Sequence, residues 1–245
     1  MKALILRFDA PLMSFGGVIV DHHGFTDRFP GTAMLCGLIA NALGLRHSEF
    51  DALQTLQSRI RFAARWDVAP RQFLDYQTVD LAQPKMCRPS WTSRGRAEHR
   101  GGGPAAKFGT HQRFRHFWAD GLMTVALGFC DDEDPDVEAV EAAIRAPARP
   151  LFLGRKACLP ARPLLDPGQP TVEGEDVLAI LCQVAVWDRH GQPVAAPGAV
   201  QACWPADAPG PPGEANRVYD LRDWANQVPS SSRLRMEGLI GEGLT

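Results

Sequence analysis

Two segments near the start of the chain decide the fold. Residues 2–8 read Lys-Ala-Leu-Ile-Leu-Arg-Phe, an apolar run of strand length, and a loop containing Pro and Gly follows over 9–28. Residues 32–43 read Thr-Ala-Met-Leu-Cys-Gly-Leu-Ile-Ala-Asn-Ala-Leu, in which apolar side chains recur every three or four positions. That spacing predicts a helix, and Pro30 before it and Gly44 after it are start and stop signals. The chain therefore opens with a buried strand followed by a helix.

Further strands and helices follow in an order that suits one compact domain. A short helix is expected over 49–57, and strict alternation with a basic outer face predicts a strand over 60–66. Other expected elements are a strand over 72–79, a strand over 122–129, and a helix over 136–145 with acids in its first turn. This order is compatible with an α+β fold of the ferredoxin-like (RRM-like) kind.

The last third of the chain has a weaker pattern. Residues 178–187 are apolar and are expected to begin as a helix and end as a strand, whereas 207–213 are rich in Pro and Gly and form a loop. Residues 217–224 are a possible strand. We therefore expect a small β-rich C-terminal part.

Composition excludes several classes of protein. The 245 residues are 45% hydrophobic and 22% charged, which is typical of a globular protein and not of a disordered one. No run reaches the length of about 18 to 20 apolar residues that spans a membrane, and the first residues lack the pattern of a secretory signal. A cytoplasmic protein with no membrane partner is expected.

The net charge of −2 conceals a segregation of charge along the chain. Residues 85–115 carry eight basic side chains and one acid, Glu98, whereas residues 131–141 carry seven acids and no base. Arg also outnumbers Lys by 22 to four, and a GC-rich genome explains this excess as well as an RNA-binding role does. A GC-rich genome does not explain why the charges are segregated along the chain. A basic local segment in a nearly neutral protein permits a nucleic-acid partner on one face.

Between residues 80 and 110 the periodicity is lost. A stretch of this length without a pattern is unusual inside a compact domain. It is either a surface insertion without a role or a basic arm that becomes ordered on a partner, and its charge favours the arm.

Sequence signatures of enzymes and metal sites are missing. There is no phosphate-binding loop motif, dinucleotide fingerprint, nucleophile elbow or zinc-protease motif. The six Cys show no metal-ligand spacing, and the adjacent His22 and His23 are more typical of an exposed loop than of a metal site. No metal and no cofactor is expected.

Two segments combine basic groups with glycine or aromatic groups in a way that suits RNA. Residues 111–118 read His-Gln-Arg-Phe-Arg-His-Phe-Trp, and planar Arg and aromatic groups stack on unpaired bases. Gly154-Arg155-Lys156 places two cations beside a glycine that lets a sugar-phosphate chain approach. The alternative is that Phe114, Phe117 and Trp118 belong to the core.

Several motifs resemble, in order, the CasD family of subunits of Cascade, the type I-E CRISPR surveillance complex. The resemblance covers about residues 2–160, and the segments that carry it are 6–16 (Leu-Arg-Phe-Asp-Ala-Pro-Leu-Met-Ser-Phe-Gly), 28–32 (Arg-Phe-Pro-Gly-Thr), 37–44 (Gly-Leu-Ile-Ala-Asn-Ala-Leu-Gly), 75–79 (Asp-Tyr-Gln-Thr-Val), 115–121 (Arg-His-Phe-Trp-Ala-Asp-Gly) and 151–158 (Leu-Phe-Leu-Gly-Arg-Lys-Ala-Cys). Phe15 stands where the family usually has Trp, and residues 86–106 are longer and richer in Gly than the family pattern.

The resemblance implies a repeat-associated RNA-binding fold and a role without catalysis. Residues 1–165 would form a ferredoxin-like RNA-binding domain with a long basic hairpin, the thumb, inserted at about 80–112, and residues 166–245 a β-rich extension. Such a subunit binds and caps the five-prime handle of the CRISPR RNA in antiviral defence. Its partners would be that RNA, the backbone subunit CasC and the large subunit CasA, with target DNA reached indirectly. The expected RNA-binding residues are Met13, Ser14, Gly16, Arg28, Arg88, Lys107, His111, Arg113, Gly154, Arg155 and Lys156.

An endoribonuclease that cuts CRISPR repeat RNA without metal is the alternative. Related subunits of another subtype use a Tyr, a Lys and a His, and the candidates here are Tyr76, Lys107 and His111, or His116 in place of His111. Such chemistry needs a base at the 2′-hydroxyl, an acid at the leaving oxygen and a cation on the phosphate. Because Lys107 and His111 are separated by three residues, the binding role is preferred. A third possibility is a scaffold protein without RNA contact.

Overall fold

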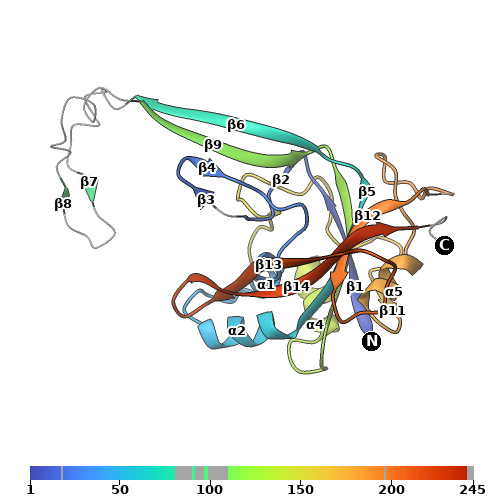
Figure 1. Ribbon diagram of the computed structural model, residues 1–245. Coiled ribbons are helices and arrows are strands. Elements are labelled where there is room, and N and C mark those ends of the chain that lie inside the picture. The colour runs from blue at the N-terminus through green and yellow to red at the C-terminus, as the bar shows by residue number, and fades with distance from the viewer. Residues whose placement is uncertain (18, 81–89, 92–96, 99–109, 196, 242–245) are drawn as a thin grey trace. The chain divides into compact units, whose positions relative to one another are not determined.

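The chain divides into two compact units. The computed structural model describes residues 1–17, 19–80, 90–91, 97–98, 110–195 and 197–241. One unit consists of Met1–Gly17, Thr26–Phe73 and Phe117–Thr245, and the other of Val18–Phe25 and Leu74–His116. Both strands and helices contribute, in a mixed architecture of several sheets and few helices (Figure 1).

The larger unit is built on a seven-stranded sheet whose neighbouring strands are antiparallel. The strands, in spatial order, are β11 (Thr171–Glu173), β1 (Lys2–Asp9), β10 (Leu122–Phe129), β5 (Ile60–Val68), β12 (Val200–Pro205), β14 (Val228–Ile240) and β13 (Glu214–Asp223). The N-terminal and C-terminal parts of the chain thus share one sheet.

Helices cover the two faces of this sheet unequally. Side chains of α1 (Thr32–Leu43), α2 (Phe50–Arg59) and α4 (Val137–Arg145) pack in one core cluster with Leu4 and Leu6. The intervening Ala3 and Ile5 belong to a second cluster, which includes α5 (Val177–Gln183). Because successive side chains of a strand point to opposite faces, α5 covers the face opposite to the other three helices (Figure 1).

Several predicted elements are confirmed. The helix over 32–43 and the strand over 122–129 have the expected bounds, and the helix over 136–145 begins after Asp136, whose carboxylate accepts a hydrogen bond from the Ala139 amide. Gly44 ends α1 in the left-handed conformation that favours glycine, with φ of 83°. The apolar pattern and the capping signals in the sequence were therefore sufficient to predict these three elements.

Three expectations were wrong. Strand β5 does not have a basic outer face, because Arg65 is buried and only Arg61 is exposed among its arginines. Residues 178–187 start as helix α5, but no strand follows; Trp187 forms only an isolated bridge. The loop over 9–28 contains three short strands, β2 (Leu12–Met13), β3 (Ile19–Val20) and β4 (His23–Gly24).

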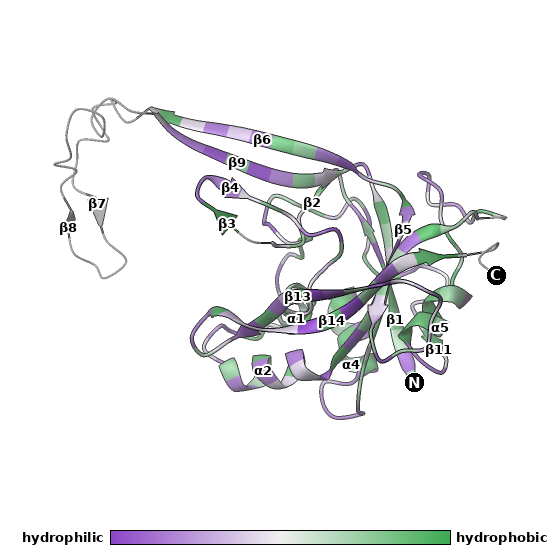
Figure 2. Ribbon diagram, in the orientation of Figure 1, coloured by the Kyte–Doolittle hydropathy of each residue, from purple (hydrophilic) through white to green (hydrophobic). Residues whose placement is uncertain are grey.

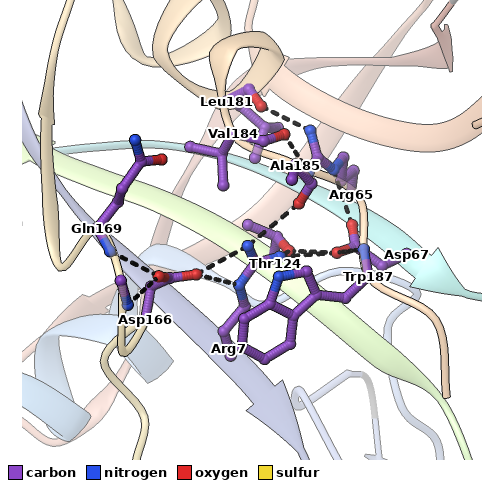
Figure 3. A network of polar contacts seen from close by, with 11 residues as sticks. Arg7, Arg65, Asp67, Thr124, Asp166, Gln169, Leu181, Val184, Ala185 and Trp187 are labelled. Atoms are coloured by element: carbon purple, nitrogen blue, oxygen red, sulfur yellow. Dashed lines mark hydrogen bonds and ion pairs between the residues drawn. The ribbon is translucent and has the colours of Figure 1, made fainter. Parts of the chain in front are cut away.

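A buried ionic network explains why Arg65 is inside. The Asp67 carboxylate accepts hydrogen bonds from Arg65 Nε at 2.7 Å, Arg7 at 2.8 Å and the Trp187 amide at 2.9 Å. Arg7 also donates to Asp166, and Arg65 donates to the carbonyls at the end of α5 (Figure 3). The network ties residues 166–187 to the sheet by charges, in addition to the apolar packing of α5 against the sheet.

A second sheet includes three short strands. Its order is β2-β9-β4-β3, where β9 is Thr110–Ala119, and β6 (Arg71–Asp80) also pairs with β9. Hydrophilic residues dominate β9 (Figure 2). Most of the predicted insertion over 80–112 lies outside the described residues. Its described parts are the last residue of β6, the first residues of β9, and a two-stranded pair of β7 (Ser90–Trp91) and β8 (Ala97–Glu98). Within the described part of the chain, no helix is both long and apolar enough to cross a membrane.

Candidate functional site

The loop after β1 is the centre of the candidate site. Its start is fixed by the short strand β2, in which Met13 pairs with Trp118 of β9. The chain then turns at Gly16 and Gly17, whose φ angles of 90° and 135° lie in the region that favours glycine. Met13 and Phe15 point into the main core, whereas both glycines are exposed. Buried side chains therefore anchor the loop, while its glycine backbone is exposed to solvent.

Residues 26–29 lie against this loop through hydrogen bonds. The Phe15 amide donates to Thr26 Oγ1 at 2.9 Å, and the Asp27 amide donates to the Gly16 carbonyl at 2.7 Å. The Trp118 indole donates to the Asp27 carbonyl at 2.6 Å. Arg28 follows with an exposed side chain, and Phe29 returns to the core. This arrangement presents Arg28 beside the glycine loop.

The turn over 153–158 packs directly on the same loop. The Ser14 amide donates to the Leu153 carbonyl at 3.1 Å, and the Leu153 amide donates to the Cys158 carbonyl at 2.8 Å. Gly154 has φ of 93°, and a Cβ at this position would lie 1.4 Å from the Ser14 carbonyl oxygen. Only glycine permits this approach of two backbones.

The turn carries two cations. The Arg155 guanidinium lies over the Phe117 ring, 4.7 Å from its centroid, which orients its plane. Lys156 is exposed. Arg28 is exposed on the segment that is hydrogen-bonded to the loop, so the segments that pack together here carry three cations. Such groups bind phosphate oxygens, and the arrangement can hold an anionic chain.

Ser14 has a buried hydroxyl beside the turn. The side chain is 1% exposed, and its Oγ has no hydrogen-bond partner among the described residues. A buried polar atom without a partner is costly. The Ser14 hydroxyl is therefore suited to hydrogen-bond with a bound ligand or with water.

Strand β14 packs against Phe29, next to the site, and the sequence did not predict this strand. Arg235 is buried, lies over the Phe29 ring at 5.6 Å and pairs with Glu237. Burial raises the pKa of the Asp27 carboxyl, and the attraction of Arg235 partly opposes that rise. The alternation of Arg233 and Arg235 with apolar residues was the signal that could have identified this strand.

The structure brings together most of the expected RNA-binding residues and separates others. Seven lie in the three packed segments: Met13, Ser14, Gly16, Arg28, Gly154, Arg155 and Lys156. The Met13 side chain is fully buried, so its part in the site is to hold the loop. His111 and Arg113 belong to the smaller unit, and Arg88 and Lys107 lie outside the described residues.

Of the candidate nuclease residues, Lys107 lies outside the described residues, and Tyr76 and His111 contact different rings. Tyr76 stacks on Phe114 at 4.9 Å, and His111 lies edge-on to His22 at 5.5 Å. No ring contact or hydrogen bond joins Tyr76 to His111 in the described part of the chain. Across the same residues, no group of three or more His, Cys, Asp or Glu side chains could hold a metal ion.

Comparisons with known proteins agree with one another. The family described as "CRISPR-associated protein (Cas_Cas5)" matches residues 3–238. The chain is 30% identical over 169 residues to "CRISPR system Cascade subunit CasD" of Escherichia coli (strain K12), covering 66% of this chain and 68% of that protein.

Two solved structures share the fold. A chain of a "CRISPR RNA-guided surveillance complex" superposes with a TM-score of 0.66 at 22% identity, covering 97% of this chain and 89% of that one. A second, "Crystal structure of Cas protein", has a TM-score of 0.58 at 21% identity and covers 97% and 93% of the two chains.

Proposed function

The chain belongs to the Cas5 family of CRISPR-associated proteins, and from this premise we propose that it is a subunit of a type I-E Cascade complex. In that role it binds and caps the five-prime handle of the CRISPR RNA for antiviral defence. Similarity to a named Cascade subunit over two thirds of its length supports the role in the complex.

One observation carries the proposal for RNA binding. Residues 13–16, 26–28 and 153–156 are far apart in sequence, yet they meet in one site through backbone hydrogen bonds and the close approach at Gly154. Arg28, Arg155 and Lys156 belong to these segments, and Gly16 is exposed on the same loop. Cations on segments with accessible backbone suit a sugar-phosphate chain.

The strand order supports a ferredoxin-like core. In that fold, four antiparallel strands and two helices follow the chain as β-α-β-β-α-β. Here β1, β5, β10 and β11 have this order with α1 and α4 between them, and their spatial order is β11-β1-β10-β5. Strands β12, β14 and β13 then extend the sheet. We place the domain boundary near residue 165, before β11, so that β11 completes the core from the extension.

The paired strands β6 and β9 support the proposed thumb. They enter and leave the stretch at about 80–112, and their pairing gives this stretch the base of a hairpin. The proposed contacts of Arg88 and Lys107 with RNA, and of the thumb with the backbone subunit CasC, lie beyond the described residues. CasA is the other proposed protein partner, and target DNA is reached only through the complex.

Co-expression tests the proposed function. This chain, its neighbouring Cascade subunits and a CRISPR array should yield a complex that contains the chain and a guide RNA, with ultraviolet crosslinks from the chain to the RNA's five-prime end. Recovery of the same complex with the same guide RNA when the chain is omitted would contradict the proposal. A complex that needs the chain but gives no crosslink would support a scaffold instead.

Catalysis has its own test. We propose that the chain does not cut RNA, because it is similar to a named Cascade subunit and because no ring contact or hydrogen bond joins Tyr76 to His111 among the described residues. Purified protein incubated with repeat RNA in EDTA should leave the RNA intact. A single cut that disappears in Tyr76→Phe would establish the endoribonuclease alternative.

A further inference from the structure

Five aromatic rings form a row in the smaller unit. His23 of β4 stacks on Phe114 of β9, with ring centroids 4.6 Å apart and planes 8° apart. Tyr76 of β6 stacks on Phe114 at 4.9 Å, and Phe25 lies 5.6 Å from His23 and 4.8 Å from His116. We call these five residues the ring row.

Backbone register sets the spacing of the ring row. His23 and Phe114 are partners in the parallel pairing of β4 with β9. His116 follows Phe114 by two residues in β9, so it points to the same face. Phe25 lies just after β4 and joins the row through its ring contacts with His23 and His116. Because the sheet fixes these positions, the stack exists before any ligand binds.

The ends of the ring row are open to solvent. Tyr76 at one end is 51% exposed, and Phe25 at the other is 42% exposed, while the three rings between them are half-buried. If the five rings were only part of a hydrophobic core, the rings at both ends of the row would be buried. Each end instead offers a flat ring on which another planar group can stack.

The polarity of the ring row favours nucleic acid over an apolar protein surface. Three of its rings have polar edges, and His23 Nδ1 lies 3.4 Å from His116 Nε2. Exposed aromatic planes with polar edges are typical of surfaces on which unpaired RNA bases stack. Arg113 and Arg115 are exposed on β9, on the face opposite to Phe114 and His116.

We infer that the ring row is a stacking platform for unpaired RNA bases, one base on Tyr76 and another on Phe25. This inference rests on the proposed function, which supplies the RNA, and it adds a second contact of a different kind. The Gly154 turn holds phosphates, whereas the ring row holds base planes. Base stacking on one aromatic ring is worth about 5- to 150-fold in affinity.

Fluorescent bases test the inference on the full-length chain. Single-stranded RNAs of repeat sequence would each carry 2-aminopurine at one position, and stacking quenches its fluorescence. The wild-type chain should quench one or two positions. Tyr76→Leu should lose quenching at one of them and weaken binding about 5- to 150-fold, whereas Tyr76→Phe should retain both properties.

A variant at Phe25 tests the other end of the ring row, in case Tyr76→Leu misfolds. A double variant at Arg155 and Lys156 separates base stacking from phosphate binding. Phe25→Leu should lose quenching at a different position, with Phe25→Trp as its control. Replacing Arg155 and Lys156 with Ala should weaken binding of every RNA but leave quenching intact at saturating protein. That separation distinguishes the ring row from the phosphate site.

The negative outcomes are also distinct. Unchanged quenching and affinity in both Leu variants would overturn the inference and leave the proposed function standing. A wild-type chain that binds no RNA, alone or in the complex, would overturn both. If the Leu variants keep their quenching but lose neighbouring subunits during purification, the ring row is a protein interface and the inference is wrong.

Discussion

The carbonyl oxygen of Ser14 occupies the space that a side chain at position 154 would need. A Cβ on Gly154 would lie 1.4 Å from this oxygen and 2.6 Å from its carbon, and neither is a flexible side-chain atom that could move aside. The φ of 93° at Gly154 adds backbone strain for any other residue. The turn over 153–158 and the loop after β1 therefore fit each other only with glycine at this position.

Substitution Gly154→Ala should separate the turn from the loop. Because both the clash and the positive φ oppose alanine, we expect destabilisation by more than about 1 kcal/mol and a large loss of RNA affinity. Urea denaturation and RNA titration would measure the two effects. Gly198→Ala is the matched control, since a Cβ at Gly198 meets nothing within 4 Å. Equal behaviour of the two variants would contradict this account of the site.

The salt dependence of RNA binding should identify phosphate contacts. Replacing Arg155 and Lys156 with Ala removes two cations, so the slope of log affinity against log salt should decrease by about 1.4 for single-stranded RNA. The control is replacement of Arg145 and Arg217 with Ala, because these residues lie outside the site and their loss changes the net charge by the same amount. A slope that changes equally in both double variants would show that only the total charge matters.

Local patterns in the sequence predicted the helices and the central strands. The apolar spacing over 32–43 and the continuous apolar run over 122–129 depend on neighbouring residues, and both were confirmed. The resemblance to CasD grouped Gly16, Arg28 and Gly154 as site residues before their proximity was known. It could do so because the family motif holds that information, whereas periodicity does not.

Long-range polar contacts could not be predicted in this way. The alternation over 60–66 placed Arg65 on an exposed face, because nothing near it in the sequence reveals the carbonyls of Leu181 and Val184 as its partners. Asp67 is only two residues away, but its burial depends on the distant Arg7 and the Trp187 amide. Likewise, Asp220 of β13 accepts a hydrogen bond from the Thr32 amide at the start of α1 at 2.9 Å. Strand β14 was missed since its three consecutive serines interrupt the alternation.

Substitution Asp67→Asn should destabilise the protein strongly. Asp67 is fully buried and binds both Arg7 and Arg65, so the amide would leave two buried guanidinium groups without their shared counter-charge. Loss of one partner of a buried ion pair typically costs about 3–5 kcal/mol. The midpoint of urea denaturation should fall accordingly, while Asp75→Asn, at a half-buried position outside this network, should have little effect. A loss below about 1 kcal/mol would mean that water replaces the carboxylate.

Thiol labelling should follow burial. Cys36 and Cys203 are buried, and desolvation raises the pKa of each thiol to about 12. Iodoacetamide at pH 8 should therefore modify the exposed Cys130 and Cys182 before Cys36 and Cys203, as peptide mass spectrometry would show. Cys36 and Cys203 should react only after unfolding in urea. Their modification in the native protein at the rate of Cys130 would refute the packing described around α1 and β12.

The same two thiols should make stability fall at alkaline pH. An unfolded Cys ionises near pH 8.5, whereas burial raises the pKa of Cys36 and Cys203 to about 12 in the native state. The native state therefore retains both protons while the unfolded state loses them, and the free energy of unfolding decreases above pH 8.5 by up to about 1.4 kcal/mol per pH unit and thiol. The stabilising contribution is complete below pH 8.5 and is lost as the pH rises toward 12. Urea denaturation at pH 7.5, 9 and 10 should show this slope in the wild type and a shallower one in Cys36→Ala/Cys203→Ala. Parallel slopes in the two proteins would show that these thiols are not buried in their protonated form.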